Sequence, residues 1–298
     1  MSGEYATPFA FRRALTDRLR ALATSSRWTL PQLQRQFAYD RLLERLYRRD
    51  EGWVVKGATA LLARGIGVRA TIDIDLYRAV DVEAAETELR AAARTDLGDW
   101  FAFEIGPARP AGDVASARRL PVAARVGNTV WASFHIDLAE RELQMIGRPD
   151  RVPALANLGM ATVKQHGYRA YPLVDHVADK VAAMHEVHGT AAVPSTRFRD
   201  LVDLVAICLT SSLSAKSLIT AVSSEAARRG LFLPDRIRVP DHQVWARGYA
   251  AEARRSLLSE AMTLEEALLV VGAFLDPVLD GTARGAWDSV TRTWKSMQ

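Results

Sequence analysis

Apolar residues recur at helical spacing through two segments near the start of the chain. In residues 9–23 the apolar positions are three or four residues apart, with arginines between them. These positions are Phe11, Leu15, Leu19 and Leu22. A second stripe follows residues 28–31 and consists of Leu33, Phe37, Leu42, Leu43 and Leu46. This spacing predicts an amphipathic helix in each segment. Thr29 is the expected N-cap of the second helix, because Pro31 suits a first helical turn.

Between residues 53 and 138 the pattern indicates strands as well as helices. Residues 72–76 alternate Ile72, Ile74 and Leu76 with acidic positions, which is the period of a strand with one buried face. Short strands are also expected at residues 54–55 and 101–105. A hairpin is expected from residues 120–126 and 129–138, which flank a turn at Gly127-Asn128. The alanine and glutamate content of residues 82–94 predicts a helix.

From about residue 150 the pattern is almost entirely helical. A turn-rich stretch at residues 148–153 marks the change. Helices are expected at residues 174–187, 215–229, 241–256, 264–275 and 286–296. These elements predict an α/β (α+β) protein in two parts. Residues 1–150 would hold a mixed sheet flanked by helices, and residues 151–298 a mostly helical C-terminal domain.

Composition narrows the class of protein without changing this picture. The chain has 298 residues, 49% of them apolar and 25% charged, as in an ordinary globular protein. No apolar run approaches the ~18 residues of a membrane span, and residues 1–10 lack a signal-peptide pattern, so we expect a cytoplasmic protein without a membrane partner. Cys208 is the only cysteine, which excludes an internal disulfide and a cysteine-based zinc site. The net charge of +4 permits a nucleic-acid partner without requiring one.

The strongest chemical signal lies between Lys56 and Tyr77. Asp73 and Asp75 are two residues apart on a predicted strand, so both carboxylates point to the same face. Two such carboxylates repel each other unless a cation lies between them, and Mg²⁺ prefers one or two carboxylates together with phosphate oxygens. Ahead of them, a tight turn at Gly57 leads into a predicted helix, whose first N–H groups can bind phosphate. This order of turn and carboxylates predicts a nucleotidyl-transfer site.

The turn and the carboxylates together resemble a known superfamily. Gly57-Ala58-Thr59, then a helix, then Asp73-Ile74-Asp75 is similar to the pattern of the DNA polymerase β-like nucleotidyltransferases. Ala58 stands where that superfamily usually has a second glycine, which removes some backbone freedom. The resemblance implies a polymerase β-like mixed sheet that carries the two aspartates.

The resemblance also implies a third metal-binding carboxylate on a neighbouring strand. Asp137 fits that position, because it follows an isoleucine in an alternating segment as Asp73 does. Asp113, in a loop, and Glu104, on a predicted strand, are the alternatives. Asp73, Asp75 and Asp137 would hold the catalytic metal ions.

Lys180 belongs to a later motif that resembles the AbiEii-type branch of the superfamily. It lies in residues 179–183 on a predicted helix, where the branch has a lysine that contacts the nucleotide phosphates. From spacing alone, the simpler interpretation is a surface lysine paired with Asp179 or Glu186.

Residues 197–203 resemble the R-x-x-D-L-x-D signature of the same branch. Asp200 and Asp203 are three residues apart on a helix and therefore share a face. Asp200 would accept from Lys180 or help to place the base, whereas Asp203 is expected to be a structural partner for an arginine. The four motifs occur in the expected order across roughly residues 30 to 210.

Resemblance to the AbiEii and MenT-type enzymes implies a function. The chain would be a magnesium-dependent nucleotidyltransferase that moves a nucleoside monophosphate from a nucleoside triphosphate to a hydroxyl acceptor. The implied acceptor is the 3′ end of tRNA, and the implied role is that of a toxin with a cognate antitoxin. The phosphates would lie in a cleft completed by the C-terminal domain, against the following residues: Lys56, Gly57, Ala58, Thr59 and Thr71.

Two alternatives remain open at the level of the sequence. The same site could transfer to a protein hydroxyl, including this chain's own Thr71, which stands two residues before Asp73. The chain could also be a catalytically silent nucleotide- or RNA-binding module, since Ala58 departs from the usual glycine.

Overall fold

The chain forms two compact units. The computed structural model describes residues 5–111, 114–139, 144–156, 158–160, 163–188, 193–256, 258 and 262–296. The first unit contains Met1–Arg64, Ala70–Leu143 and Pro149–Ala170. The second contains Gly65–Arg69, Gln144–Arg148 and Tyr171–Gln298. The boundary expected at residue 150 differs from this division, because residues 149–170 contribute two strands to the sheet of the first unit.

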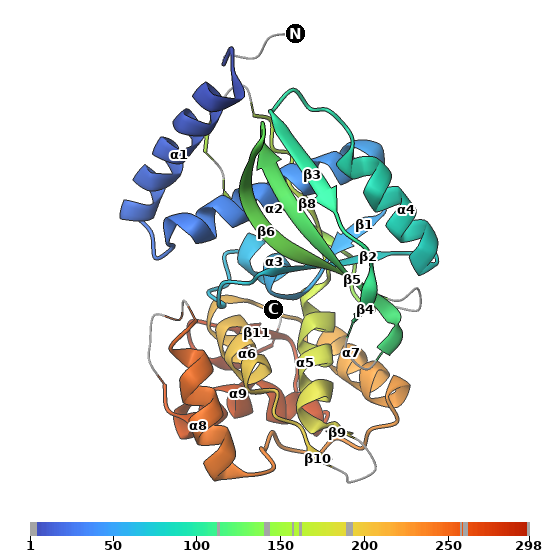
Figure 1. The fold of residues 1–298 in the computed structure, drawn as a ribbon. Helices are drawn as coiled ribbons and strands as arrows, with labels where there is room; N and C mark the ends of the chain where they lie inside the picture. The colour runs from blue at the N-terminus through green and yellow to red at the C-terminus, as the bar shows by residue number, and fades with distance from the viewer. Residues whose placement is uncertain are drawn as a thin grey trace. The chain divides into compact units, whose positions relative to one another are not determined.

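A mixed β-sheet flanked by helices forms the centre of the first unit, as predicted (Figure 1). Its strands are β1 (Trp53–Val55), β2 (Asp73–Arg78), β3 (Phe101–Ile105), β4 (Arg109–Ala111), β5 (Val114–Val126), β6 (Thr129–Leu138), β7 (Asp150–Val152) and β8 (Tyr168–Ala170). Among the described residues their order is β3-β5-β6-β2-β1-β8-β7, with β4 beside β5. β2, which carries Asp73 and Asp75, lies between β1 and β6. It is antiparallel to β1, which leads into the turn at Gly57, and parallel to β6, which carries Asp137.

Local sequence explains the helices of the first unit, which are α1 (Pro8–Thr24), α2 (Leu30–Arg49), α3 (Gly57–Ala63) and α4 (Val82–Ala93). The Thr7 side chain caps α1 by accepting from the amide of Ala10. Thr29 is the N-cap of α2, as predicted, and forms a capping box with Gln32. The apolar stripe of α2 is buried in the core with the inward-facing residues of the sheet.

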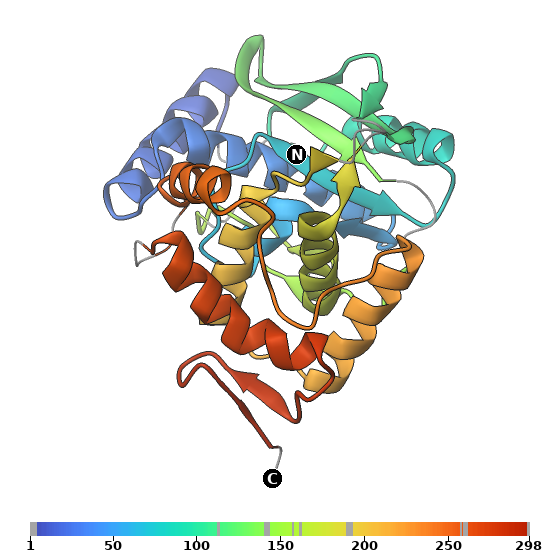
Figure 2. The same ribbon diagram turned by 90° about the horizontal axis from the view of Figure 1, so that it is seen from below.

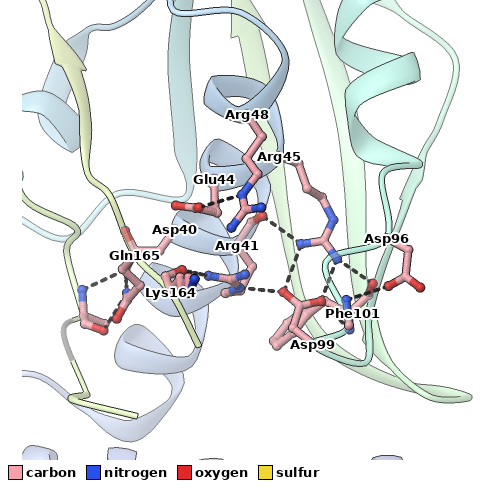
Figure 3. A network of polar contacts seen from close by, with 12 residues as sticks. Asp40, Arg41, Glu44, Arg45, Arg48, Asp96, Asp99, Phe101, Lys164 and Gln165 are labelled. Atoms are coloured by element: carbon pink, nitrogen blue, oxygen red, sulfur yellow. Dashed lines mark hydrogen bonds and ion pairs between the residues drawn. The ribbon is translucent and has the colours of Figure 1, made fainter. Parts of the chain in front are cut away.

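Buried charges anchor α2 within the first unit, and Figure 3 shows their contacts. Asp99 accepts from Arg41 Nε at 2.6 Å and from Arg45 Nη2 at 2.7 Å. Burial opposes ionisation of Asp99, but the two guanidinium groups hold the pKa of this carboxyl below its ordinary value. Asp40 instead accepts from the amides of Leu155 and Ala156 at 2.9 and 2.8 Å. Burial raises the pKa of Asp40 to about 7.

The second unit is mostly helical, as predicted. Its elements are α5 (Leu173–His185), β9 (Val187–His188), β10 (Val193–Pro194), α6 (Phe198–Thr210), α7 (Ala215–Arg228), α8 (His242–Ala253), α9 (Leu264–Leu279), β11 (Ala286–Asp288) and β12 (Thr293–Lys295). Cys208 is buried on α6, and burial raises the pKa of its thiol to about 12. No helix among the described residues is long and apolar enough to cross a membrane.

The last element differs from the sequence prediction, because residues 286–296 form a hairpin and not a helix. Trp287 pairs with Trp294 across β11 and β12, and both rings contact Phe274 of α9. Figure 2 shows the hairpin beside α9, close to the C-terminus. A separation of seven residues suits one face of a helix and also a cross-strand pair. The indole of Trp287 donates to the carbonyl of Cys208 at 2.8 Å, which fixes the strand.

Candidate active site

The three predicted aspartates lie on one face of the sheet in the first unit. β2 and β6 pair in register, so Asp75 stands opposite Asp137 and Asp73 stands opposite His135. Ile74 on the same strand is fully buried on the other face, which is the alternation that the sequence pattern predicts. Neighbouring strands are ~4.8 Å apart, so the carboxylates can act as one group.

The two alternatives for the third carboxylate do not share this position. Glu104 is on β3, which two strands separate from β2, and it pairs with Arg125 at 2.7 Å. Asp113 lies outside the described residues. Among the described residues, Asp137 is therefore the carboxylate that the sheet register places beside Asp75.

The turn after β1 brings Gly57 against Asp75. Gly57 has φ of +58°, and a Cβ at this position would lie 1.8 Å from Asp75 Oδ2. Only glycine combines this backbone conformation with so close an approach. The amide of Lys56 donates to the Asp75 carbonyl at 2.8 Å, which joins the turn to β2.

Ala58 needs no special backbone conformation. It lies in the first turn of α3, and the non-glycine residues with positive φ in the described part of the chain are Trp100 and Arg292. Alanine in place of a second glycine therefore imposes no strain here. The amides of residues 57–59 belong to the helical turn whose N–H groups lack intrahelical acceptors.

Two threonine hydroxyls hold the backbone of Asp73. Thr59 is fully buried and donates to the Asp73 carbonyl at 3.2 Å. The Thr71 hydroxyl donates to the same carbonyl at 3.2 Å and accepts from the Asp73 amide at 3.1 Å. Tyr39 in turn donates to the Thr71 carbonyl at 3.1 Å. Both threonine side chains thus position the first aspartate.

Arg119 is the functional candidate that sequence reasoning missed. From β5 it donates through Nε to Asp137 Oδ1 at 2.8 Å and through Nη2 to Oδ2 at 2.6 Å. Its Nη2 is also 4.0 Å from Asp73 Oδ2. The hydrogen bonds to Asp137, with the charges of the other two aspartates, raise the pKa of Arg119.

Within the described ranges, no three His, Cys, Asp or Glu side chains are arranged as a ready-made metal site.

The position of Arg119 depends on a β-bulge that the sequence pattern does not predict. With a regular hairpin around Gly127-Asn128, Arg118 would stand opposite Asp137, since Val126 pairs with Thr129. An irregularity at residues 124–125 shifts the register by one, so Arg119 takes that place. Knowledge of the bulge is therefore needed to identify the correct arginine.

A recess of about 540 Å³ opens beside Asp73 on the same face of the sheet. Its lining includes Arg35, Ile72, Pro121, Ser133 and His135. Ile72, expected on the buried face with Ile74 and Leu76, is instead 53% exposed, because β2 begins only at Asp73. His135 Nδ1 and Asp73 Oδ1 are 3.5 Å apart. Neither of these two buried atoms has a hydrogen-bond partner among the described residues.

In the second unit the later motifs meet as predicted. Lys180 on α5 donates through Nζ to Asp200 Oδ1 at 2.9 Å and to Asp203 Oδ2 at 2.5 Å. Arg197 Nε donates to the other oxygen of Asp200 at 2.6 Å. Burial works against each charge, yet Lys180 and Arg197 keep the pKa of Asp200 low, whereas burial raises the pKa of Asp203.

The alternative interpretation of Lys180, as a surface lysine paired with Asp179 or Glu186, does not hold. Lys180 is buried, and Arg229 pairs with both Asp179 at 3.5 Å and Glu186 at 2.8 Å. One expectation about this cluster was wrong. Asp203, expected to bind an arginine, hydrogen-bonds to Lys180 instead.

Comparisons with known proteins identify the family and the fold. Residues 41–290 match the family described as nucleotidyl transferase AbiEii toxin, type IV toxin–antitoxin system. Among solved structures, MenT4, a nucleotidyltransferase toxin from Mycobacterium tuberculosis, is 15% identical with a TM-score of 0.51, and the match covers 94% of this chain and 99% of MenT4. A Helicobacter pylori protein described as a nucleotidyltransferase is 15% identical with a TM-score of 0.50, and the match covers 86% and 97%. No curated protein matches the chain.

Proposed function

Because the chain belongs to the AbiEii family of nucleotidyl transferase toxins, we propose that it moves a nucleoside monophosphate from a nucleoside triphosphate to an RNA hydroxyl in a magnesium-dependent reaction. The observation that carries this proposal is the register of β2 and β6. It places Asp75 opposite Asp137, with Asp73 on the same face of the sheet.

The donor set on this face fits Mg²⁺. The three aspartates supply hard carboxylate oxygens, which Mg²⁺ prefers. Asp73 Oδ1 is a buried oxygen without a hydrogen-bond partner among the described residues, as expected for an atom kept for a ligand. Asp73, Asp75 and Asp137 would hold the metal, which when bound neutralises charge on the phosphates and favours loss of the acceptor hydroxyl proton.

We assign the triphosphate to the turn at residues 56–59. The chain approaches Asp75 there with no side chain on Gly57, so a phosphate can lie near both the backbone amides and the carboxylate. α3 has only seven residues, so the individual N–H groups of Gly57, Ala58 and Thr59 matter more than a helix dipole. Thr59 and Thr71 support this arrangement indirectly, since their hydroxyls hold Asp73.

Strand order suggests where the acceptor binds. The phosphate turn follows β1, on one side of β2, whereas the recess lies over β6, β5 and β3, on the other side. An in-line displacement needs the attacking oxygen and the leaving pyrophosphate on opposite sides of the α-phosphorus. The recess beside Asp73 is therefore our candidate for the acceptor end. Exposed Ile72 offers it an apolar surface, and Arg35 a positive charge.

Lys180 remains our candidate for a phosphate contact. Its ammonium group has three N–H donors, and Asp200 and Asp203 account for two of them among the described residues. The role of the pair Asp200 and Asp203 is to orient Lys180 and keep it charged.

The 3′ end of tRNA is the acceptor that we propose, on the basis of the family resemblance, and a cognate antitoxin is the proposed protein partner. A tRNA acceptor would place the activity in the cytoplasm. The test is incubation of the chain with Mg²⁺, total tRNA and each α-labelled nucleoside triphosphate, followed by separation of RNA from protein. Label at the tRNA 3′ end supports the proposal.

Other outcomes of this incubation would contradict it. Label on the protein, mapped to Thr71 or elsewhere, would favour protein modification. Nucleotide binding without any label would favour a catalytically silent module. Asp75→Ala must abolish labelling in either enzymatic case.

A further inference from the structure

Arg119 is a cation placed against the proposed metal ligands. It binds both oxygens of Asp137, at 2.8 and 2.6 Å, and lies 4.0 Å from an oxygen of Asp73. The three aspartates carry three negative charges on one face of the sheet, and Arg119 neutralises part of them. A bidentate guanidinium is the geometry that a carboxylate binds best in the absence of a metal.

We propose that Arg119 is a built-in counter-ion that competes with the divalent metal for Asp137 and is displaced when the metal binds. The inference rests on the proposed function, since it takes Asp137 to be a metal ligand. It assigns Arg119 a positioning role: this residue keeps the carboxylates together when no metal is bound, and it sets how tightly the metal binds.

Charge explains the competition. Arg119 engages Asp137 Oδ1 and Oδ2 together, so a metal on either oxygen would lie close to the guanidinium. Two cations so close repel each other, which lowers metal affinity as long as Arg119 stays. Loss of the arginine side chain therefore favours the metal.

Exposure explains how Arg119 can leave. Its side chain is 44% exposed, so the guanidinium can turn into solvent without disturbing the core. Ion pairs with this much exposure contribute little to stability, and long arginine side chains remain well solvated after they separate. The pair is therefore weak enough for a divalent cation to replace it.

Neighbouring arginines on β5 show that the arrangement is specific to residue 119. Arg118 lies on the opposite face and pairs with Glu83 and Glu86 of α4. Arg125 pairs with Glu104 at 2.7 Å, away from β2. Arg125 is thus a matched control: an arginine of the same strand in a partly exposed ion pair.

The test is a calorimetric titration of the full chain with Mn²⁺, without nucleotide, for wild type, Arg119→Ala, Arg119→Lys and Arg125→Ala. We expect Arg119→Ala to bind Mn²⁺ about two- to fivefold more tightly than wild type, with Arg119→Lys between them and Arg125→Ala unchanged. Thermal melting without metal should show only a slightly lower Tm for Arg119→Ala, since the exposed pair contributes little to stability, and Mn²⁺ should raise that Tm more than it raises that of wild type.

The outcomes separate this inference from the proposed function. If Asp75→Ala abolishes Mn²⁺ binding but Arg119→Ala binds Mn²⁺ no more tightly than wild type, the counter-ion role is wrong and the metal site stands. If Mn²⁺ binding is absent, or is insensitive to Asp75→Ala, the metal site and the counter-ion role both fail.

Discussion

Asp75 lies directly against the backbone of Gly57. A Cβ on Gly57 would stand 1.8 Å from Asp75 Oδ2, and Gly57 also has φ of +58°. The residue that opens the proposed phosphate turn therefore also sets the position of a proposed metal ligand. Turn and carboxylate are two parts of one arrangement.

Gly57→Ala should reduce nucleotidyl transfer by about a hundredfold, because it pushes Asp75 away from its place and small displacements at a reacting centre are costly. Gly65→Ala is the matched control. Gly65 has φ of +75°, yet nothing lies within 4 Å of its Cβ position, so this variant carries the backbone strain without the clash. Equal loss in both variants, measured as initial transfer rates, would show that backbone strain is the cause and not contact with Asp75.

Asp137→Asn should lower the transfer rate about a thousandfold or more while the fold is retained, because a neutral amide replaces a metal-binding charge. Asp17→Asn, in an exposed pair with Arg20 on α1, provides the control and should leave the rate unchanged. Circular dichroism checks the fold. A transfer rate for Asp137→Asn near that of wild type would remove Asp137 from the site.

Lys180→Met should destabilise the chain by about 3 to 5 kcal/mol, because it leaves two buried carboxylates without their shared cation. Urea denaturation measures the change in the free energy of unfolding. Lys216→Met, at an exposed position of α7, should change it by no more than about 0.5 kcal/mol. Similar values for the two variants would mean that Lys180 does not hold Asp200 and Asp203.

The free energy of unfolding should decrease as the pH rises from 5 to 8, because of Asp40. Its folded-state pKa, about 7, lies above the ordinary carboxyl value, so in this window the folded chain holds a proton that the unfolded chain has released. The free energy of unfolding should fall by about 2 to 3 kcal/mol up to pH 7 and then level off. Urea denaturation at several pH values tests this. Asp40→Asn should lack this component, and an identical pH dependence in both proteins would contradict the assignment.

The sequence predicted the parts of this molecule that follow from local pattern. Thr29 caps α2, and the alternation of Ile74 with Asp73 and Asp75 places the two carboxylates on one face, because strand geometry dictates both results. Lys180 and Asp200 meet as their motifs implied.

Features that depend on tertiary contacts could not be predicted from the sequence pattern. The β-bulge at residues 124–125 decides which arginine faces Asp137. Packing against Phe274 decides that Trp287 and Trp294 form a hairpin and not a helix. Whether Lys180 is exposed or buried also depends on its neighbours on α6, and not on its own helix.

The most direct test of nucleotidyl transfer is a double-label experiment with one nucleoside triphosphate carrying distinct labels at the α and γ phosphates. We predict that the chain, with Mg²⁺ and tRNA, attaches the α label to the RNA and releases the γ label as pyrophosphate, and that Asp75→Ala does neither. Retention of the γ label on any acceptor, or α-label transfer that survives Asp75→Ala, would contradict the site described for Asp73, Asp75 and Asp137.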